Sequence, residues 1–226
     1  MKIVLKLGGF LFPKEMNLDL IQTYADLLKK LYSEGHQLIV VTGGGKGSRE
    51  YITAAREMGA SETICDEIGI EYTRLNSRLL ISTIPKEAFP DVPRNLQQIK
   101  NSLGFNKIIV MGGLQPGQST NAVAALAAEL IRADMFINAT DVDGIYEDDP
   151  KTNTNTKMYD EIKIKDLFDM IIKKRSIAGS YKLFDLVAVN LITRSKITTW
   201  FVNGKDPKNI ENIIHGKHIG TRIIFG

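Results

Sequence analysis

The groups best suited to chemistry in this sequence are glycine turns that follow apolar runs. The central turn is Gly43-Gly44-Gly45, which lies between the apolar residues 39–41 and a helical pattern that begins at Ser48. Glycine has no Cβ, so its backbone N–H can approach an anion, and the N-terminus of a following helix attracts the same charge. A Walker loop would need a glycine at Val40, and a dinucleotide-binding loop would need one at Ser48. The turn therefore indicates either phosphate binding or close packing.

Two further glycine turns end apolar runs, Gly8-Gly9 after residues 3–7 and Gly112-Gly113 after residues 107–111. In open α/β sheets, ligands bind outside the carboxyl ends of the strands. Glycines that served only in packing would be scattered through the elements. Their placement after strands predicts converging backbone amides that hold several phosphates, as a transfer between two phosphorylated molecules requires.

Lys6 is the cation nearest to the first turn. By the alternation of strand side chains it shares a sheet face with Val4, where an ammonium group is costly unless it reaches an anion. The alternative is a strand-end lysine whose aliphatic stem is buried and whose charge reaches solvent.

The polar loop at residues 114–120 comes directly before a helical pattern. Its side-chain amides and hydroxyls, next to a helix N-terminus, can bind an anion and the polar edges of a second ligand. The simpler interpretation is a Pro-Gly turn followed by a Ser-Thr helix cap.

The sequence offers no convincing metal site or nucleophile motif. Four aspartates share an acidic, turn-rich segment but lack the spacing of a calcium loop: Asp141, Asp143, Asp148 and Asp149. His215 and His218 lack the spacing and the accompanying acid of a zinc site, so we interpret them as surface residues. Cys65 has no neighbour in sequence that would activate its thiol, and we expect it to be buried. We therefore assign no residue as a metal ligand.

Composition narrows the class of protein. Of 226 residues, 43% are hydrophobic and 24% are charged, and no apolar run approaches the length that crosses a bilayer. The net charge of +3 comes from interspersed charges, which argues against nucleic-acid or membrane partners and is compatible with a small anionic substrate. The first residues are too charged for a secretory signal, and the single cysteine cannot form an internal disulfide. We expect a cytoplasmic protein.

Strand and helix patterns alternate along the chain. We expect strands at residues 3–7, 37–41, 107–111, 135–139, 197–202 and 221–225. We expect helices between Asn17 and Gly35, at residues 48–58, 66–84, 96–103, 122–132, 164–173 and 185–195, and after Pro207. Residues 140–156 form a turn-rich excursion. The sum is an α/β fold, a three-layer αβα sandwich with a mostly parallel central sheet, in a single domain over residues 1–226.

Five motifs occur in order along the chain. They are Lys6-Leu-Gly-Gly9; Val41-Thr-Gly-Gly-Gly45 with Arg49; Asp66 through Gly69-Ile70 with Thr73-Arg74-Leu-Asn76; Gly112-Gly-Leu-Gln-Pro-Gly-Gln-Ser-Thr120; and Thr140-Asp-Val-Asp-Gly-Ile-Tyr146 with Asp149-Pro150. Together they resemble the amino acid kinase superfamily, which has the carbamate kinase-like fold, and within it the archaeal type of uridylate kinase. The likeness extends over essentially the whole chain, and the combination is specific where a single glycine motif is not.

The resemblance implies transfer of the γ-phosphate of ATP to UMP, giving UDP and ADP in pyrimidine nucleotide biosynthesis, with Mg²⁺ as cofactor and a homohexamer as assembly. It implies that an N-terminal part, about 1–135, binds the acceptor and that a C-terminal part, about 136–226, binds ATP. The catalytic residues would be Lys6 and Asp143. The ATP-binding residues would be Lys6, Gly8, Gly9, Phe10, Gly45, Arg49, Thr140, Asp141, Tyr146 and Asp149. The UMP-binding residues would be Gly43, Gly44, Asp66, Leu114, Gln115, Pro116, Gly117, Gln118, Ser119 and Thr120.

Some positions depart from the family pattern. Phe10 stands where a small or hydroxyl-bearing residue is usual, and Asp141 replaces a usual asparagine. Gly47 stands where alanine is common, and Leu186 replaces a proline. The turn at residues 178–180, Ala-Gly-Ser, matches a family loop near the phosphates.

Two other functions stay open at this point. A kinase of the same superfamily that phosphorylates isopentenyl phosphate, carbamate or an acylated amino acid would share the ATP half. Asp66 and the loop 115–120 suit a polar nucleotide better than an apolar tail. A non-catalytic protein that binds a nucleotide or stores an oxyanion would keep the fold without the transfer, although Lys6 argues against it.

Overall fold

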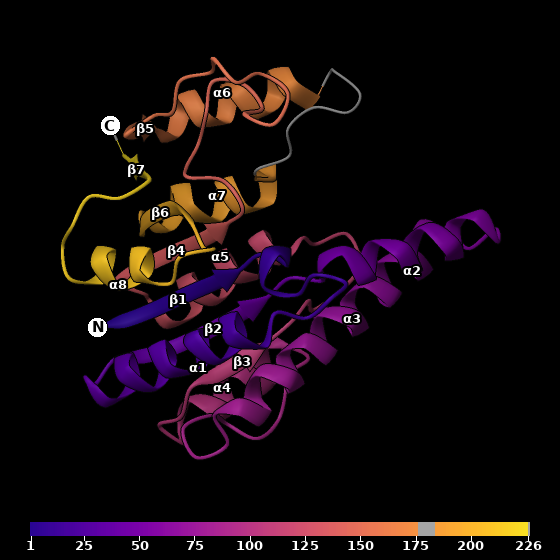
Figure 1. Cartoon of the computed structure of the whole chain (residues 1–226), viewed down its shortest axis with the longest axis vertical. Coiled ribbons are helices and arrows are strands. Elements are labelled where there is room, and N and C mark those ends of the chain that lie inside the picture. The colour runs from indigo at the N-terminus through magenta and orange to yellow at the C-terminus, as the bar shows by residue number, and fades with distance from the viewer. Residues whose placement is uncertain (176–183, 226) are drawn as a thin grey trace.

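The computed structural model describes residues 1–175 and 184–225, and in them one sheet of seven strands lies between two layers of helices (Figure 1). The strands are β1 (Lys2–Leu7), β2 (Gln37–Thr42), β3 (Ile109–Met111), β4 (Met135–Thr140), β5 (Glu161–Lys163), β6 (Thr198–Asn203) and β7 (Thr221–Ile224). Their order is β3-β2-β1-β4-β6-β7-β5, and neighbours are parallel except for β6 and β7. The expected α/β sandwich with a mostly parallel sheet is confirmed.

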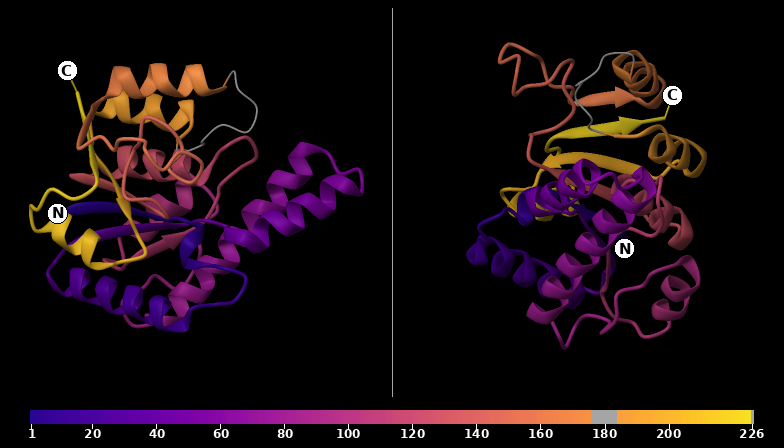
Figure 2. Two further views of the ribbon diagram at one scale, coloured as in Figure 1. Left: turned by 45° about the horizontal axis from the view of Figure 1, so that its top comes forward. Right: turned by 90° about the vertical axis from the view of Figure 1, so that its right-hand side faces the viewer.

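Helices cover both faces of this sheet (Figure 2). They are α1 (Leu18–Ser33), α2 (Gly45–Glu57), α3 (Glu62–Thr83), α4 (Leu96–Leu103), α5 (Thr120–Ile131), α6 (Ile164–Arg175), α7 (Leu186–Ser195) and α8 (Lys208–Ile214). One core cluster joins α1, α8 and the end of α3 to the face that carries Leu5, and the other joins α4, α5 and α7 to the face that carries Val4. Because both faces are buried, the strands are continuous apolar runs. No helix in the described ranges is long and apolar enough to span a membrane.

Three helices begin earlier than the sequence predicts, and one of them, α5, starts at Thr120 rather than at residue 122. Helix α2 starts at Gly45 rather than at Ser48, because the backbone of the preceding Gly44 already has a helical conformation. Helix α3 starts at Glu62 rather than at Asp66, because the Ser61 side chain caps it by accepting a hydrogen bond from the Ile64 N–H. The sequence also did not predict β5 and the 3-10 helix η1 (Gly9–Leu11), which have three residues each and are too short to show a period.

Helices α2 and α3 pack side by side and project from the body of the protein at the carboxyl edge of the sheet (Figure 1). The rings of Tyr51 on α2 and Tyr72 on α3 lie 5.8 Å apart between centroids. Arg56 near the end of α2 donates to both carboxylate oxygens of Glu62, which lies in the first turn of α3. The two packed helices therefore connect the glycine turn, at the start of α2, with Asp66 on α3.

The turns after β1 and β2 touch through their backbones. A Cβ on Gly9 would lie 2.7 Å from the Gly45 Cα, and a Cβ on Gly45 would lie 2.0 Å from the Phe12 carbonyl oxygen. Gly45 also has a φ of +70°, which other residues rarely adopt. The two turns can therefore approach this closely only when glycine occupies both positions.

We expect Gly45→Ala to lower the free energy of unfolding by about 3 kcal/mol or more, because it adds overpacking to left-handed strain. Gly59→Ala is the matched control, since Gly59 has a φ of +88° but no heavy atom within 4 Å of an added Cβ. Gly59→Ala adds only the left-handed strain, which costs about 1–2 kcal/mol. Urea denaturation of both variants measures the difference, and equal losses would contradict the packing constraint.

Candidate active site

A cavity of about 440 Å³ opens where the carboxyl ends of β1 and β4 lie side by side. Its walls come from the turn after β1, the start of α2, the first turn of α5 and the segment after β4. The lining residues are Lys6, Gly8, Gly9, Phe10, Pro13, Gly45, Lys46, Arg49, Asn121, Thr140, Asp141, Asp149 and Lys151. Because α2 and α5 both begin at this cavity, the positive ends of two helix dipoles favour an anion in it.

Lys6 reaches this cavity from the centre of the sheet. On β1 it is paired with Val41 of β2 and with Asn138 of β4. Burial lowers the pKa of the Lys6 ammonium to about 8, and the negative charge of Asp141 opposes that shift. Lys6 is therefore still mostly cationic at neutral pH, and no hydrogen bond to its ammonium occurs within the described residues. An anion in the cavity would relieve the cost of keeping this charge out of water.

The other charged residues of the cavity come from α2 and from the excursion after β4. Lys46 and Arg49 lie in the first turns of α2. Lys151 forms an ion pair with Asp141. Burial works to raise the pKa of Asp141, but the hydrogen bond and charge of Lys151 outweigh it and hold that pKa below its usual value. The cavity thus combines cations for an anionic ligand with a carboxylate that stays ionised.

Phe10 covers one side of the cavity. Its ring packs over Gly204, where an added Cβ would lie 2.2 Å from the ring, and its centroid is 6.1 Å from that of Tyr24. The Tyr24 hydroxyl donates to the Gly204 carbonyl oxygen at 2.6 Å. The unusual aromatic residue is therefore accommodated by a glycine that follows β6.

Helix α3 fixes the turns after β2 and β3. Asn76 Nδ2 donates to the Gly43 carbonyl oxygen at 2.8 Å, and Thr73 Oγ1 accepts from the Gly113 N–H at 2.7 Å. Asn76 and Thr73 are both buried. Since Gly43 begins the turn that continues to Gly45 in the cavity, α3 connects the cavity to the loop that follows β3.

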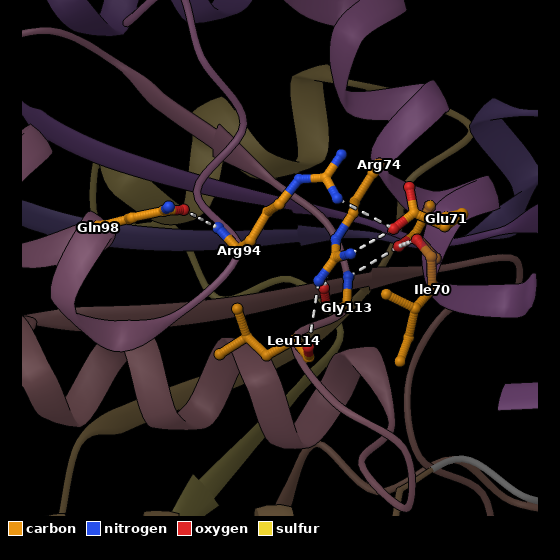
Figure 3. Close-up of polar contacts among 8 residues, drawn as sticks. Ile70, Glu71, Arg74, Arg94, Gln98, Gly113 and Leu114 are labelled. Atoms are coloured by element: carbon orange, nitrogen blue, oxygen red, sulfur yellow. Dashed lines mark hydrogen bonds and ion pairs between the residues drawn. The ribbon is translucent and has the colours of Figure 1, made fainter. Parts of the chain in front are cut away.

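Arg74 holds the start of that loop, as Figure 3 shows. Its Nε donates to the Gly113 carbonyl oxygen at 3.2 Å, and its Nη2 donates to the Leu114 carbonyl oxygen at 3.1 Å. Glu71 forms ion pairs with both Arg74 and Arg94. The guanidinium group is thereby fixed in position, and it orients two successive carbonyl groups.

The rest of the loop is attached to α3 a second time and to the N-terminus of α7. Asp66 Oδ2 accepts a hydrogen bond from the Gly117 N–H at 2.8 Å. Ser119 caps α5 and donates to Asp185, which in turn caps α7. The structure thus brings Asp66 to the polar loop 114–120, as the family resemblance implies, although Gly117 comes 51 positions after Asp66 in the sequence.

The structure gathers nine of the ten residues that the resemblance assigns to ATP. Those on the cavity wall are Lys6, Gly8, Gly9, Phe10, Gly45, Arg49, Thr140, Asp141 and Asp149. Tyr146 and Asp143 do not line the cavity. The Tyr146 hydroxyl donates to Asp143 Oδ2 at 3.2 Å, and Asn203 Nδ2 donates to Asp143 Oδ1 at 2.8 Å. Residues 178–180, matched to a family loop in the sequence, lie outside the described residues.

Sequence reasoning missed four residues of the cavity wall: Pro13, Lys46, Asn121 and Lys151. Lys46 and Asn121 could have been predicted from the sequence, because each lies near the start of an expected helix and next to an expected ligand residue. Lys151 directly follows the Asp149-Pro150 motif, so its place near the cavity could also have been predicted. Pro13 had no such signal.

The histidines and the cysteine considered for metal or thiol chemistry lie outside the cavity wall. In residues 1–175 and 184–225, no group of three or more histidine, cysteine and acidic side chains is arranged to hold a metal ion. His215 and His218 are exposed, and Cys65 is buried, as expected.

Comparisons with known proteins agree with this geometry. A model described as "Amino acid kinase family" matches residues 1–203. A protein named uridylate kinase from Methanobrevibacter smithii is 44% identical, over 99% of each chain. The crystal structure of a uridylate kinase from Archaeoglobus fulgidus superposes with a TM-score of 0.88 at 43% identity, covering 99% of this chain and 100% of that one. A UMP kinase structure from Bacillus anthracis, at 22% identity and a TM-score of 0.81, supports the fold alone.

We expect Lys6→Met to raise the free energy of unfolding at pH 7, by at most about 3 kcal/mol. The folded pKa of about 8 lies below the ordinary 10.5, so the folded protein opposes a protonation that the unfolded chain accepts. This advantage should shrink as the pH rises from 8 to 10.5, because Lys6 is then neutral in the folded wild type and the unfolded chain gains less and less by binding the proton.

Urea denaturation at pH 7 and at pH 10.5 measures this effect. Lys100→Met, on the exposed surface of α4, is the control and should change stability by less than about 0.5 kcal/mol. A Lys6→Met variant that is less stable than the wild type at pH 7 would contradict the electrostatic account.

Proposed function

The chain belongs to the amino acid kinase family, and we propose on that basis that it is a uridylate kinase, which transfers the γ-phosphate of ATP to UMP and releases UDP and ADP. The observation that carries the proposal is the cavity itself, where Lys6, Arg49 and the amides of two glycine turns surround a space for phosphate groups. Relatives with that name are 41–44% identical along almost the whole chain.

ATP occupies the cavity in this proposal. Its phosphates lie against the Gly8-Gly9 turn and the start of α2, where backbone N–H groups and the helix dipole attract anions. Its adenosine end lies toward Thr140 and Asp149, with Tyr146 beyond the cavity wall. Asp143 has a structural part in this proposal. Its carboxylate accepts hydrogen bonds from Tyr146 and Asn203, and it thereby attaches the segment after β4 to the end of β6.

UMP binds on the other side of the Gly43-Gly44-Gly45 turn, between Asp66 and the loop 114–120. The loop offers amide and hydroxyl groups that suit a uracil edge and a ribose. One oxygen of Asp66 already accepts the Gly117 N–H, which leaves the second oxygen for ribose hydroxyls. Binding of UMP would therefore complete a pocket whose two sides are already joined by a hydrogen bond.

The transfer needs alignment and charge neutralisation more than a covalent nucleophile. The UMP phosphate oxygen attacks the γ-phosphorus in line, the new P–O bond forms as the bond to the β-phosphate oxygen breaks, and ADP leaves. Lys6 stabilises the charge on the moving phosphoryl group. The attacking oxygen is already ionised near neutral pH, so no general base is required.

The residues of the cavity are compatible with Mg²⁺ that binds together with ATP. Asp141 and Asp149 line the cavity and supply oxygen donors, which Mg²⁺ prefers, while no ready cluster of three such side chains occurs in the described residues. This donor set suits an ion that arrives on the nucleotide phosphates, where it would neutralise their charge.

The proposal includes three features that rest on the family. They are a homohexameric assembly, a cytoplasmic location, and a division into an acceptor part at about 1–135 and an ATP part at about 136–226. The cavity joins the two parts, because Lys6 and Arg49 come from the first and Thr140 and Asp149 from the second.

We expect ADP to form from Mg·ATP with UMP and far more slowly with CMP, dUMP, isopentenyl phosphate or carbamate.

The Lys6→Met variant should have a kcat lowered by about 100-fold or more, while the affinity of the variant for UMP changes little, because the ammonium acts on the moving phosphoryl group. Turnover of a different acceptor would overturn the acceptor site and keep the fold. Thermal stabilisation by ATP without any ADP would favour a binding protein.

Asp66→Asn tests the acceptor site. We expect the KM for UMP to rise about 10-fold or more, because a charged hydrogen-bond acceptor is lost, while the KM for ATP stays within about threefold. Glu67→Gln, one residue further along α3 and also exposed, should leave both constants unchanged. An equal rise in both KM values for Asp66→Asn would show that the residue supports the fold rather than UMP.

A further inference from the structure

One buried polar atom lies close to the proposed catalytic lysine without a role in the mechanism so far. Asn138 is fully buried on β4, and no donor in the described residues contacts its Oδ1. A buried amide oxygen without a hydrogen bond costs roughly 1–3 kcal/mol of stability. We therefore expect this oxygen to accept a hydrogen bond when substrate is bound.

The sheet register places Asn138 directly beside Lys6. The two residues are paired across the parallel strands β1 and β4, and Val41 and Phe201 flank them on β2 and β6. Parallel partners lie about 4.8 Å apart and project from the same face. Lys6 is thus the polar neighbour of Asn138 in a row that is otherwise apolar.

Asn138 also contacts a residue of the cavity wall. Its Nδ2 donates to Asn121 Oδ1 at 3.3 Å, and Asn121 lies in the first turn of α5 and lines the cavity. One amide beneath the cavity floor therefore adjoins two side chains that reach the cavity from different elements.

We propose that Asn138 is a positioning residue for phosphoryl transfer, which fixes Asn121 through its N–H and, when nucleotide is bound, accepts a hydrogen bond from Lys6 Nζ. The lysine side chain is flexible enough to bring its ammonium to the amide oxygen while its other N–H groups face the phosphates. The inference rests on the proposed kinase activity and assigns to it a residue that does not touch the substrate.

Packing alone would favour a different residue at position 138. Leucine has a similar size, matches the apolar flanks Val41 and Phe201, and removes the unpaired Oδ1. The Asn121 oxygen that would lose its donor lies at the cavity wall, where water can replace it. An asparagine here lowers stability relative to such a residue, so its presence indicates a role outside packing.

The test compares Asn138→Leu and Asn138→Asp in the full chain with the wild type. We expect Asn138→Leu to be at least as stable to urea as the wild type, with kcat for UMP phosphorylation lowered roughly 10- to 100-fold by misplacement of Lys6. The KM for ATP should change less than about threefold, because the glycine turns and Arg49 are intact.

Asn138→Asp keeps the size and the acceptor oxygen and adds a negative charge. We expect it to retain more activity than Asn138→Leu and to move the alkaline limb of the kcat profile to higher pH, since a carboxylate favours the charged lysine. The groups that face Lys6 from other elements are Asp141, Asp149, Lys46, Arg49 and Lys151. They are the same in all three proteins, so a shift between profiles reports on position 138.

The outcomes separate the two proposals. A wild type that forms no ADP with any acceptor overturns the kinase function. An active wild type with an Asn138→Leu variant of equal kcat and equal pH profile overturns the positioning role alone. If Asn138→Leu does not fold, an unshifted alkaline limb in Asn138→Asp has the same meaning.

Discussion

The contact between the backbones of Gly9 and Gly45 is the constraint on which the rest of the site depends. It brings the turn after β1 and the start of α2 together with no side chain between them. Lys6 then lies three residues before one side of the contact, and Arg49 lies one helical turn after the other. The cavity proposed for the phosphates of ATP is shaped by main-chain atoms first, and the side chains add charge to that shape.

Helix α3 extends this constraint to the loop that we propose as the UMP site. Through Thr73, Arg74 and Asn76 it holds the turns after both β2 and β3, and Asp66 in its second turn holds the loop at Gly117. The acceptor loop is therefore tied to the same helix that adjoins the phosphate turn. In a reaction that depends on alignment, such shared support fixes the distance between two bound substrates more reliably than two independent loops would.

Most of the architecture could be predicted from the sequence, because buried parallel strands are apolar runs and their glycine turns mark the carboxyl edge. The nearness of Asp66 to the polar loop could be anticipated only from the family pattern, since nothing local pairs residues so far apart. The role of Lys151 depends on its ion pair with Asp141 in a turn-rich segment, where no period exists to place side chains. The position of Asn138 beside Lys6 follows from strand register, which an apolar run alone does not fix.

The strand order also determines when the site can form as the chain is synthesised. Strand β1 lies at the centre of the sheet between β2 and β4, and more than 120 residues separate β1 from β4. Until β4 leaves the ribosome, one edge of β1 is unpaired and exposes its backbone to other chains. Pairings of such high contact order close slowly. The pairing of β4 therefore does two things at once: it covers the open edge of β1, and it brings the segment after β4 to the cavity wall.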